Sequence, residues 1–123
     1  MGLHGRLSFI PAKNVVADAG WEGDNYVIRI RGKMREAVVF GTYLELTREI
    51  KMSLGERRFF IHDRVENLGA DPSPLMFVYH CNPGFPLLDR GARVIVHSAR
   101  TTEWLKDEEV GPEAYNRVGA PQK

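Results

Sequence analysis

One stretch of the chain, FVYHCNPGFPLL at residues 77–88, carries residue types that handle protons and hydrogen bonds. The run reads as a buried strand, and His80 and Asn82 stand two residues apart in it, so both side chains would lie on one side. A proline- and glycine-rich segment follows and ends regular pairing. An imidazole titrates near neutrality and suits general acid–base chemistry, whereas a hydrogen-bonded core histidine is the structural alternative. Both interpretations stay open at this point.

Other chemistry-bearing motifs do not occur in the sequence. There is no H-E-x-x-H, no paired C-x-x-C and no Asp-x-Asp-x-Asp spacing, so we expect no metal. There is no glycine-rich strand-to-helix loop for a nucleotide and no G-x-S-x-G nucleophile elbow. We therefore expect no cofactor.

Composition indicates one ordinary globular domain spanning residues 1–123. Apolar residues make up 43% and charged residues 27% of the 123 residues. The 17 Lys and Arg nearly balance the 16 Asp and Glu, which argues against a nucleic-acid partner, and no apolar run is long enough to span a membrane. The single cysteine, Cys81, excludes an internal disulfide framework and fits a reducing compartment. We expect a cytoplasmic protein without a membrane partner.

The hydropathy pattern predicts an all-β, antiparallel architecture of the β-sandwich type. Short segments with strand composition or period-two alternation recur at intervals typical of such folds. The expected strands are NYVIRIRG at 25–32, YLELTREIKMSL at 43–54, RRFFIHDRVEN at 57–67, PLMFVYHC at 74–81 and ARVIVHS at 92–98.

The second and third of these strands predict a hairpin with a defined register. Gly55-Glu56 suits a two-residue type II′ turn, which would place Leu54 opposite Arg57. The same register puts Arg48 opposite Asp63 on the apolar face, either as an ion pair in the core or as the polar floor of a ligand pocket. The apolar pairs that it creates are Met52–Phe59, Ile50–Ile61 and Leu46–Val65.

Several blocks of the chain resemble the aldose 1-epimerase (galactose mutarotase-like) superfamily, and most closely a poorly characterised bacterial branch of it. They are LHGRLSFIPA at 3–12, DRVENLG at 63–69 and YHCNPGFPLLDRGARV at 79–94, and the Trp, Gly-Asp and Arg-Glu-Ile spacing of 21–50 fits as well. The resemblance runs over nearly the whole chain. It implies that the chain forms part of a large antiparallel β-sandwich, the supersandwich of that superfamily. It also implies an isomerase that interconverts the α and β anomers of a free sugar.

The resemblance also implies roles for individual residues. His80 takes the position of the general acid that delivers a proton to the ring oxygen. His4 matches a histidine that holds sugar hydroxyls or shares stabilisation of the ring oxygen, and Arg6 matches a multidentate donor to hydroxyl oxygens. Asn82 either binds the sugar or closes the following turn. We expect these four residues to converge on one concave surface of the sheet.

The general base of the superfamily is a glutamate on a late strand, and the sequence assigns it to no residue. Glu103, Glu108, Glu109 and Glu113 have no motif support, and the chain ends at NRVGAPQK, before the segment where that glutamate would fall. Two functions therefore stay open, an aldose 1-epimerase-like enzyme and a non-catalytic carbohydrate-binding or structural β-domain. In both cases a short sandwich leaves strand edges and apolar surface uncovered, so we expect a homodimer or larger assembly.

Overall fold

The computed structural model describes residues 5–100 and 116–119. The chain divides into two compact units, Met1–Met76 and Phe77–Lys123, and each is described by itself. The expectation of a single sandwich domain over 1–123 stays a prediction.

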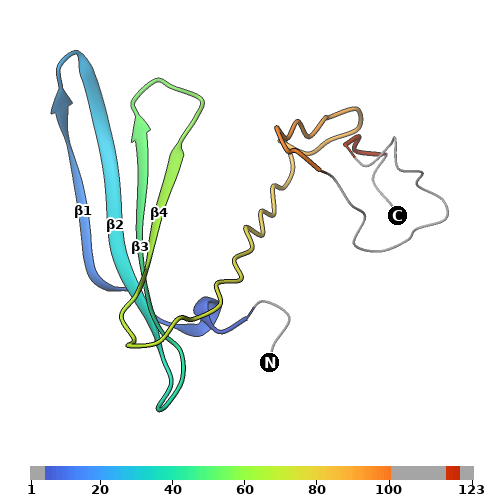
Figure 1. The fold of residues 1–123 in the computed structure, drawn as a ribbon. Coiled ribbons are helices and arrows are strands. Elements are labelled where there is room, and N and C mark those ends of the chain that lie inside the picture. The colour runs from blue at the N-terminus through green and yellow to red at the C-terminus, as the bar shows by residue number, and fades with distance from the viewer. Residues whose placement is uncertain (1–4, 101–115, 120–123) are drawn as a thin grey trace. The chain divides into compact units, whose positions relative to one another are not determined.

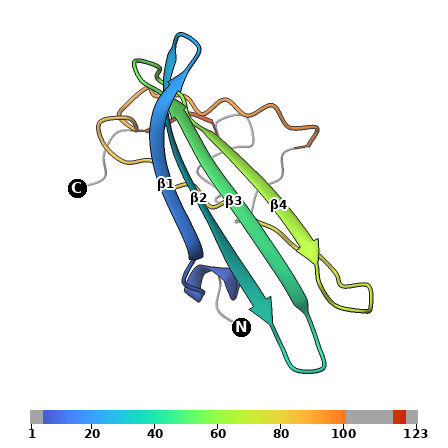
Figure 2. The same cartoon turned by 90° about the vertical axis from the view of Figure 1, so that its left-hand side faces the viewer.

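The first unit holds a four-stranded antiparallel sheet preceded by a short 3-10 helix, η1 (Leu7–Phe9). The strands follow one another in chain order across the sheet, as Figure 2 shows face-on. The β1–β2 and β3–β4 loops lie at one end of the sheet, and the β2–β3 loop lies at the other end near η1 (Figure 1). The strands are β1 (Lys13–Glu22), β2 (Asn25–Ala37), β3 (Tyr43–Ser53) and β4 (Phe60–Asn67).

Helical structure in the described residues is confined to η1, so the expected all-β class is confirmed at the level of an antiparallel sheet. In the same residues there is no helix with the length and apolarity that crossing a membrane requires.

Period-two alternation gives the sheet two different faces. The apolar face carries the aliphatic side chains of β2, β3 and β4, and the polar face carries most of the charged ones. Burial is limited: in the described part of the chain only Val27, Leu46 and Glu45 are buried. The apolar side chains of this face are Tyr26, Ile28, Ile30, Met34, Leu44, Leu46, Ile50, Met52, Ile61 and Val65.

The predicted register of β3 against β4 is confirmed, whereas the predicted turn is wrong. Arg48 lies opposite Asp63, but the ladder stops at Lys51 and Phe60, so the pairs expected closer to the turn do not form. Instead, the Glu56 amide donates to the Ser53 carbonyl at 3.1 Å, which is the hydrogen bond between the first and fourth residues of a β-turn. Gly55 occupies the third turn position with φ of +84°, as a type II turn requires.

Strand β1 was not expected from the sequence. It lies at the sheet edge with every residue exposed, so it has little of the alternation that marks a half-buried strand. The two-residue glycine turn occurs here, where Gly23 adopts φ of +59° between the paired residues Glu22 and Asn25. A bulge interrupts the pairing between Lys13 and Val16.

In the segment after β4, the two predicted strands at 74–81 and 92–98 are wrong. Residues 74–81 form no ladder, and 92–98 contribute only an isolated bridge between Arg93 and Arg117. Three backbone hydrogen bonds of 2.9–3.1 Å join residues 91–94 to 116–118. β-branched and aromatic residues fit a sheet surface, but a strand forms only where a partner backbone pairs with it.

Candidate functional site

Arg6 is the first of the predicted site residues that the structure describes. Gly5 turns the chain at φ of +70°, and the Arg6 carbonyl then accepts a hydrogen bond of 3.0 Å from the Phe9 amide, which fixes the start of η1. The Arg6 side chain remains 46% exposed. Its Nη1 donates to Oε1 of Glu36 at 2.6 Å, so the guanidinium is tied to the end of β2.

Glu36 is a residue that the sequence analysis missed. Its strand partner is Leu44, which places it in the same alternating set as Ile30 and Met34, on the apolar side of the sheet. A signal was present, because continuing the alternation of β2 beyond Gly32 puts a carboxylate on that side. A charge in such a place calls for a partner, and Arg6 is that partner.

His80 and Asn82 belong to the second unit, and both are exposed. They lie in a segment without ladder pairing, just after two aromatic residues that are also two positions apart. The rings of Phe77 and Tyr79 contact each other edge to face, with centroids 5.0 Å apart. This contact is what an extended chain produces when residues i and i+2 share a side.

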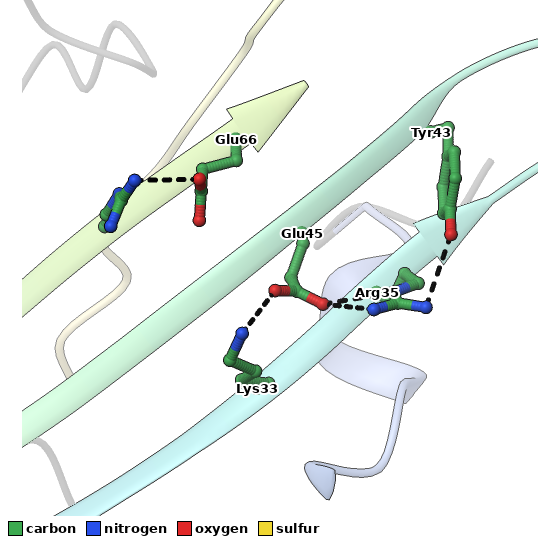
Figure 3. Close-up of polar contacts among 6 residues, drawn as sticks. Lys33, Arg35, Tyr43, Glu45 and Glu66 are labelled. Carbon is green, nitrogen blue, oxygen red and sulfur yellow. Dashed lines mark hydrogen bonds and ion pairs between the residues drawn. The ribbon is translucent and has the colours of Figure 1, made fainter. Parts of the chain in front are cut away.

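Glu45 forms a second polar cluster, on the polar face of the sheet (Figure 3). Its Oε1 accepts from Lys33 Nζ at 2.6 Å, and its Oε2 accepts from Arg35 Nε at 3.1 Å and Nη2 at 2.5 Å. Arg35 also lies over the Tyr43 ring, 5.6 Å from its centroid, and donates to the Tyr43 hydroxyl at 3.3 Å. The hydrogen bond from Lys33, followed by that from Arg35, lowers the pKa of Glu45.

One known protein family matches the whole chain. A family model described as a domain of unknown function, DUF4432, matches residues 1–123. The chain belongs to this family. No curated protein and no solved structure matches the chain significantly.

The best-bonded carboxylates of this DUF4432 chain are poor general bases. In Glu45 and Glu22 both carboxylate oxygens already accept from cations, Glu22 from Arg29 and Lys51. The hydrogen bond from Lys51, followed by that from Arg29, lowers the pKa of Glu22 as well. A general base needs a free lone pair and a pKa near the working pH. Glu22 and Glu45 therefore form ion pairs that stabilise the sheet instead.

Metal-ligating side chains and a surface depression bear on ligand binding in the residues that the structure describes. Among them, no group of three or more His, Cys, Asp or Glu side chains gathers closely enough to hold a metal ion. A depression of about 180 Å³ lies along β1 and β2, below the range of about 300–1,000 Å³ that ligand pockets usually occupy. Arg29, which lines this depression, is already paired with Asp18 and Glu22, so few of its N–H donors remain for a ligand.

The predicted convergence of the four site residues stays a prediction. His4 lies outside the described residues, as do the four late glutamates. Arg6 belongs to the first unit of the DUF4432 chain, and His80 and Asn82 belong to the second. Each of these three is exposed and therefore accessible to a ligand.

Proposed function

We propose that this DUF4432 chain binds a free monosaccharide as part of an aldose 1-epimerase-like, β-sandwich protein. The proposal rests on the resemblance of the His-Gly-Arg block at 4–6 and the Tyr-His-x-Asn-x-Gly block at 79–84 to that superfamily. One structural observation supports it: His80 is exposed, so a ligand can reach its side chain. The apolar face of the four-stranded sheet supports the sandwich, because a second layer would cover it.

In the proposed reaction, each residue has one task. His80 delivers a proton to the ring oxygen while a general base removes the proton of the anomeric hydroxyl. The bond between C1 and the ring oxygen breaks and a carbonyl forms at C1. Rotation about C1–C2 and reclosure, with the two protons returned, gives the other anomer. Arg6 and Asn82 hold sugar hydroxyls during these steps.

The chain by itself is proposed to bind sugar without efficient turnover. The well-bonded carboxylates Glu22 and Glu45 are occupied by cations, and no motif assigns the base. One positioned proton-transfer group typically contributes about 10²–10⁴-fold to a rate, so an acid without its base is a poor catalyst. This observation favours the carbohydrate-binding alternative for the isolated chain.

Binding and turnover are separated by two measurements with D-galactose and D-glucose. Ligand-observed NMR titration reports affinity, and polarimetry reports anomerisation. We expect weak binding, lowered by Arg6→Ala and His80→Ala, and a rate close to that of buffer. His62→Ala is the matched control, because His62 is also exposed but lies on the polar face of β4. Absence of binding to either sugar would overturn the proposal, and fast anomerisation abolished by His80→Ala would show that the chain contains a base.

A further inference from the structure

We infer that Glu36 positions Arg6 and cancels its charge, so that the subsite takes neutral sugar hydroxyls and discriminates against acidic sugars. This inference rests on the proposed function. The inference goes beyond the proposed function because it assigns a role to Glu36, a residue that no sequence motif marks, and because it predicts which sugars are rejected.

The ion pair holds only one corner of the guanidinium. Oε1 of Glu36 accepts from Nη1 of Arg6 at 2.6 Å, a short charge-assisted bond. A guanidinium carries five N–H donors in a rigid plane, and in the part of the chain that the structure describes the others of Arg6 are not engaged. Arg6 is thus fixed in direction while donors remain for a ligand.

Glu36 is the anchored member of the pair. It lies within β2 and its side chain is 24% exposed, whereas Arg6 precedes η1 and is 46% exposed. The neighbouring cation on the strand does not compete for it, because Arg35 points to the opposite face and binds Glu45. Glu36 therefore sets the position of Arg6, and the strand sets the position of Glu36.

The charge balance of the pair determines which ligands are favoured. An unpaired guanidinium is a preferred partner for carboxylates and phosphates, which it binds with two parallel hydrogen bonds. With Glu36 in contact, an anionic ligand meets a carboxylate as well as a guanidinium, and repulsion between like charges offsets the attraction. A neutral hexose still receives the remaining donors.

The test compares D-galactose with D-galacturonate at constant ionic strength, using ligand-observed NMR titrations of the full chain. For the parent we expect tighter binding of galactose. For Glu36→Gln we expect the galacturonate-to-galactose affinity ratio to rise by about two- to fivefold, the scale of a partly exposed ion pair. Glu36→Asp keeps the charge and should retain most of the parent's selectivity. Glu56→Gln is the matched control, since Glu56 also binds an arginine, Arg58, but within the β3–β4 loop, which lies at the end of the sheet opposite the β2–β3 loop and η1 (Figure 1).

The possible outcomes separate this inference from the proposed function. If the parent binds galactose and Glu36→Gln keeps the parent's ratio, the role of Glu36 is wrong and the proposed function stands. If the parent binds neither sugar, the proposed function falls and this inference falls with it.

A second measurement on the parent needs no variant, so it holds even if Glu36→Gln does not fold. We expect slow solvent exchange of the Arg6 Nη–H protons in ¹⁵N-arginine spectra, because Nη1 donates to Glu36. Exchange as fast as in an unfolded peptide would overturn the positioning role.

Discussion

Arg48 and Asp63 face each other across β3 and β4 and form a two-point ion pair, with Nε to Oδ1 and Nη2 to Oδ2 both at 2.8 Å. The pair lies in the middle of the apolar face, beside Ile50 and Leu46 on β3. The Asp63 side chain is 6% exposed and that of Arg48 is 32% exposed, so the carboxylate is the shielded member. On β2 the residue opposite Arg48 is Gly32, which adds no side chain to the row.

Arg48→Met should destabilise the protein, because it leaves the shielded Asp63 carboxylate without this partner. We expect a loss of about 1.5–3 kcal/mol, the cost of removing a hydrogen-bonded charged group. A fully buried pair would cost about 3–5 kcal/mol, but Arg48 is partly exposed. Urea unfolding followed by circular dichroism measures the difference, and an unchanged midpoint would contradict it.

The double variant Arg48→Met/Asp63→Leu is the control for this prediction. It removes both charges and leaves an apolar pair of similar size, which is often neutral or stabilising. We expect it to regain most of the stability lost by Arg48→Met. Equal losses in the single and double variants would mean that packing by Arg48, rather than its charge, matters.

The Arg48–Asp63 pair shows that a period-two pattern can predict which residues of two neighbouring strands lie opposite each other. Two alternating segments joined by a short loop predict the register of β3 and β4, because a slip by one residue would expose every apolar side chain. The same reasoning failed for residues 74–81, whose composition suits a strand but which have no ladder partner in the described chain. Pairing depends on residues distant in sequence, and a local pattern does not contain them.

The candidate site was predictable only in part. Period-two spacing places His80 and Asn82 on one side of an extended chain, whereas only the resemblance links Arg6 to them. Arg6 and Glu36, which contact each other, are 30 residues apart in the sequence. The alternation of β2 predicts that Glu36 lies on the apolar side of the sheet, but it does not predict that Arg6 is its partner.

Glu45 should make stability fall in acid. Its pKa is below the ordinary value of 4.5 in the folded protein, mainly because of Lys33 and then Arg35. A lowered folded pKa stabilises the protein above the unfolded pKa, and this contribution is lost as the pH falls through the folded value. We therefore expect the free energy of unfolding to decline below about pH 4.5, and Glu45→Gln to reduce that decline.

Urea titrations between pH 6 and 3, read by linear extrapolation, measure this slope. Asp24→Asn is the control, because Asp24 lies in the β1–β2 turn and makes no ion pair among the described residues. Glu22 and Glu56 also have a lowered pKa, so the slope should decrease without vanishing. The same slope in Glu45→Gln and the parent would contradict the prediction.

Phe40 should be a site where substitution stabilises the protein. It lies in the β2–β3 loop with φ of +57°, a left-handed conformation that costs most residues energy, and it is fully exposed. Phe40→Gly relieves this cost without removing packing, so we expect a gain of about 0.5–1 kcal/mol in urea unfolding. Val39→Gly is the control, since Val39 is exposed but has no left-handed φ, and it should be neutral or destabilising. A loss of stability in Phe40→Gly would show that the ring has a role in the folded chain.

The apolar face should drive association between copies of this chain. Ile30, Ile50 and Ile61 form one row across three strands, with exposures of 48%, 37% and 40%. A continuous exposed apolar patch of this kind favours burial against another surface, so we expect a dimer or larger species by light scattering at micromolar concentration. Ile61→Lys should shift the protein toward monomer, because burying the patch would then also bury an unpaired ammonium. Val39→Lys introduces the same charge on the β2–β3 loop, away from the row, and should leave the assembly unchanged. A monomeric parent across the concentration range, or equal effects of the two lysine variants, would contradict association through this face.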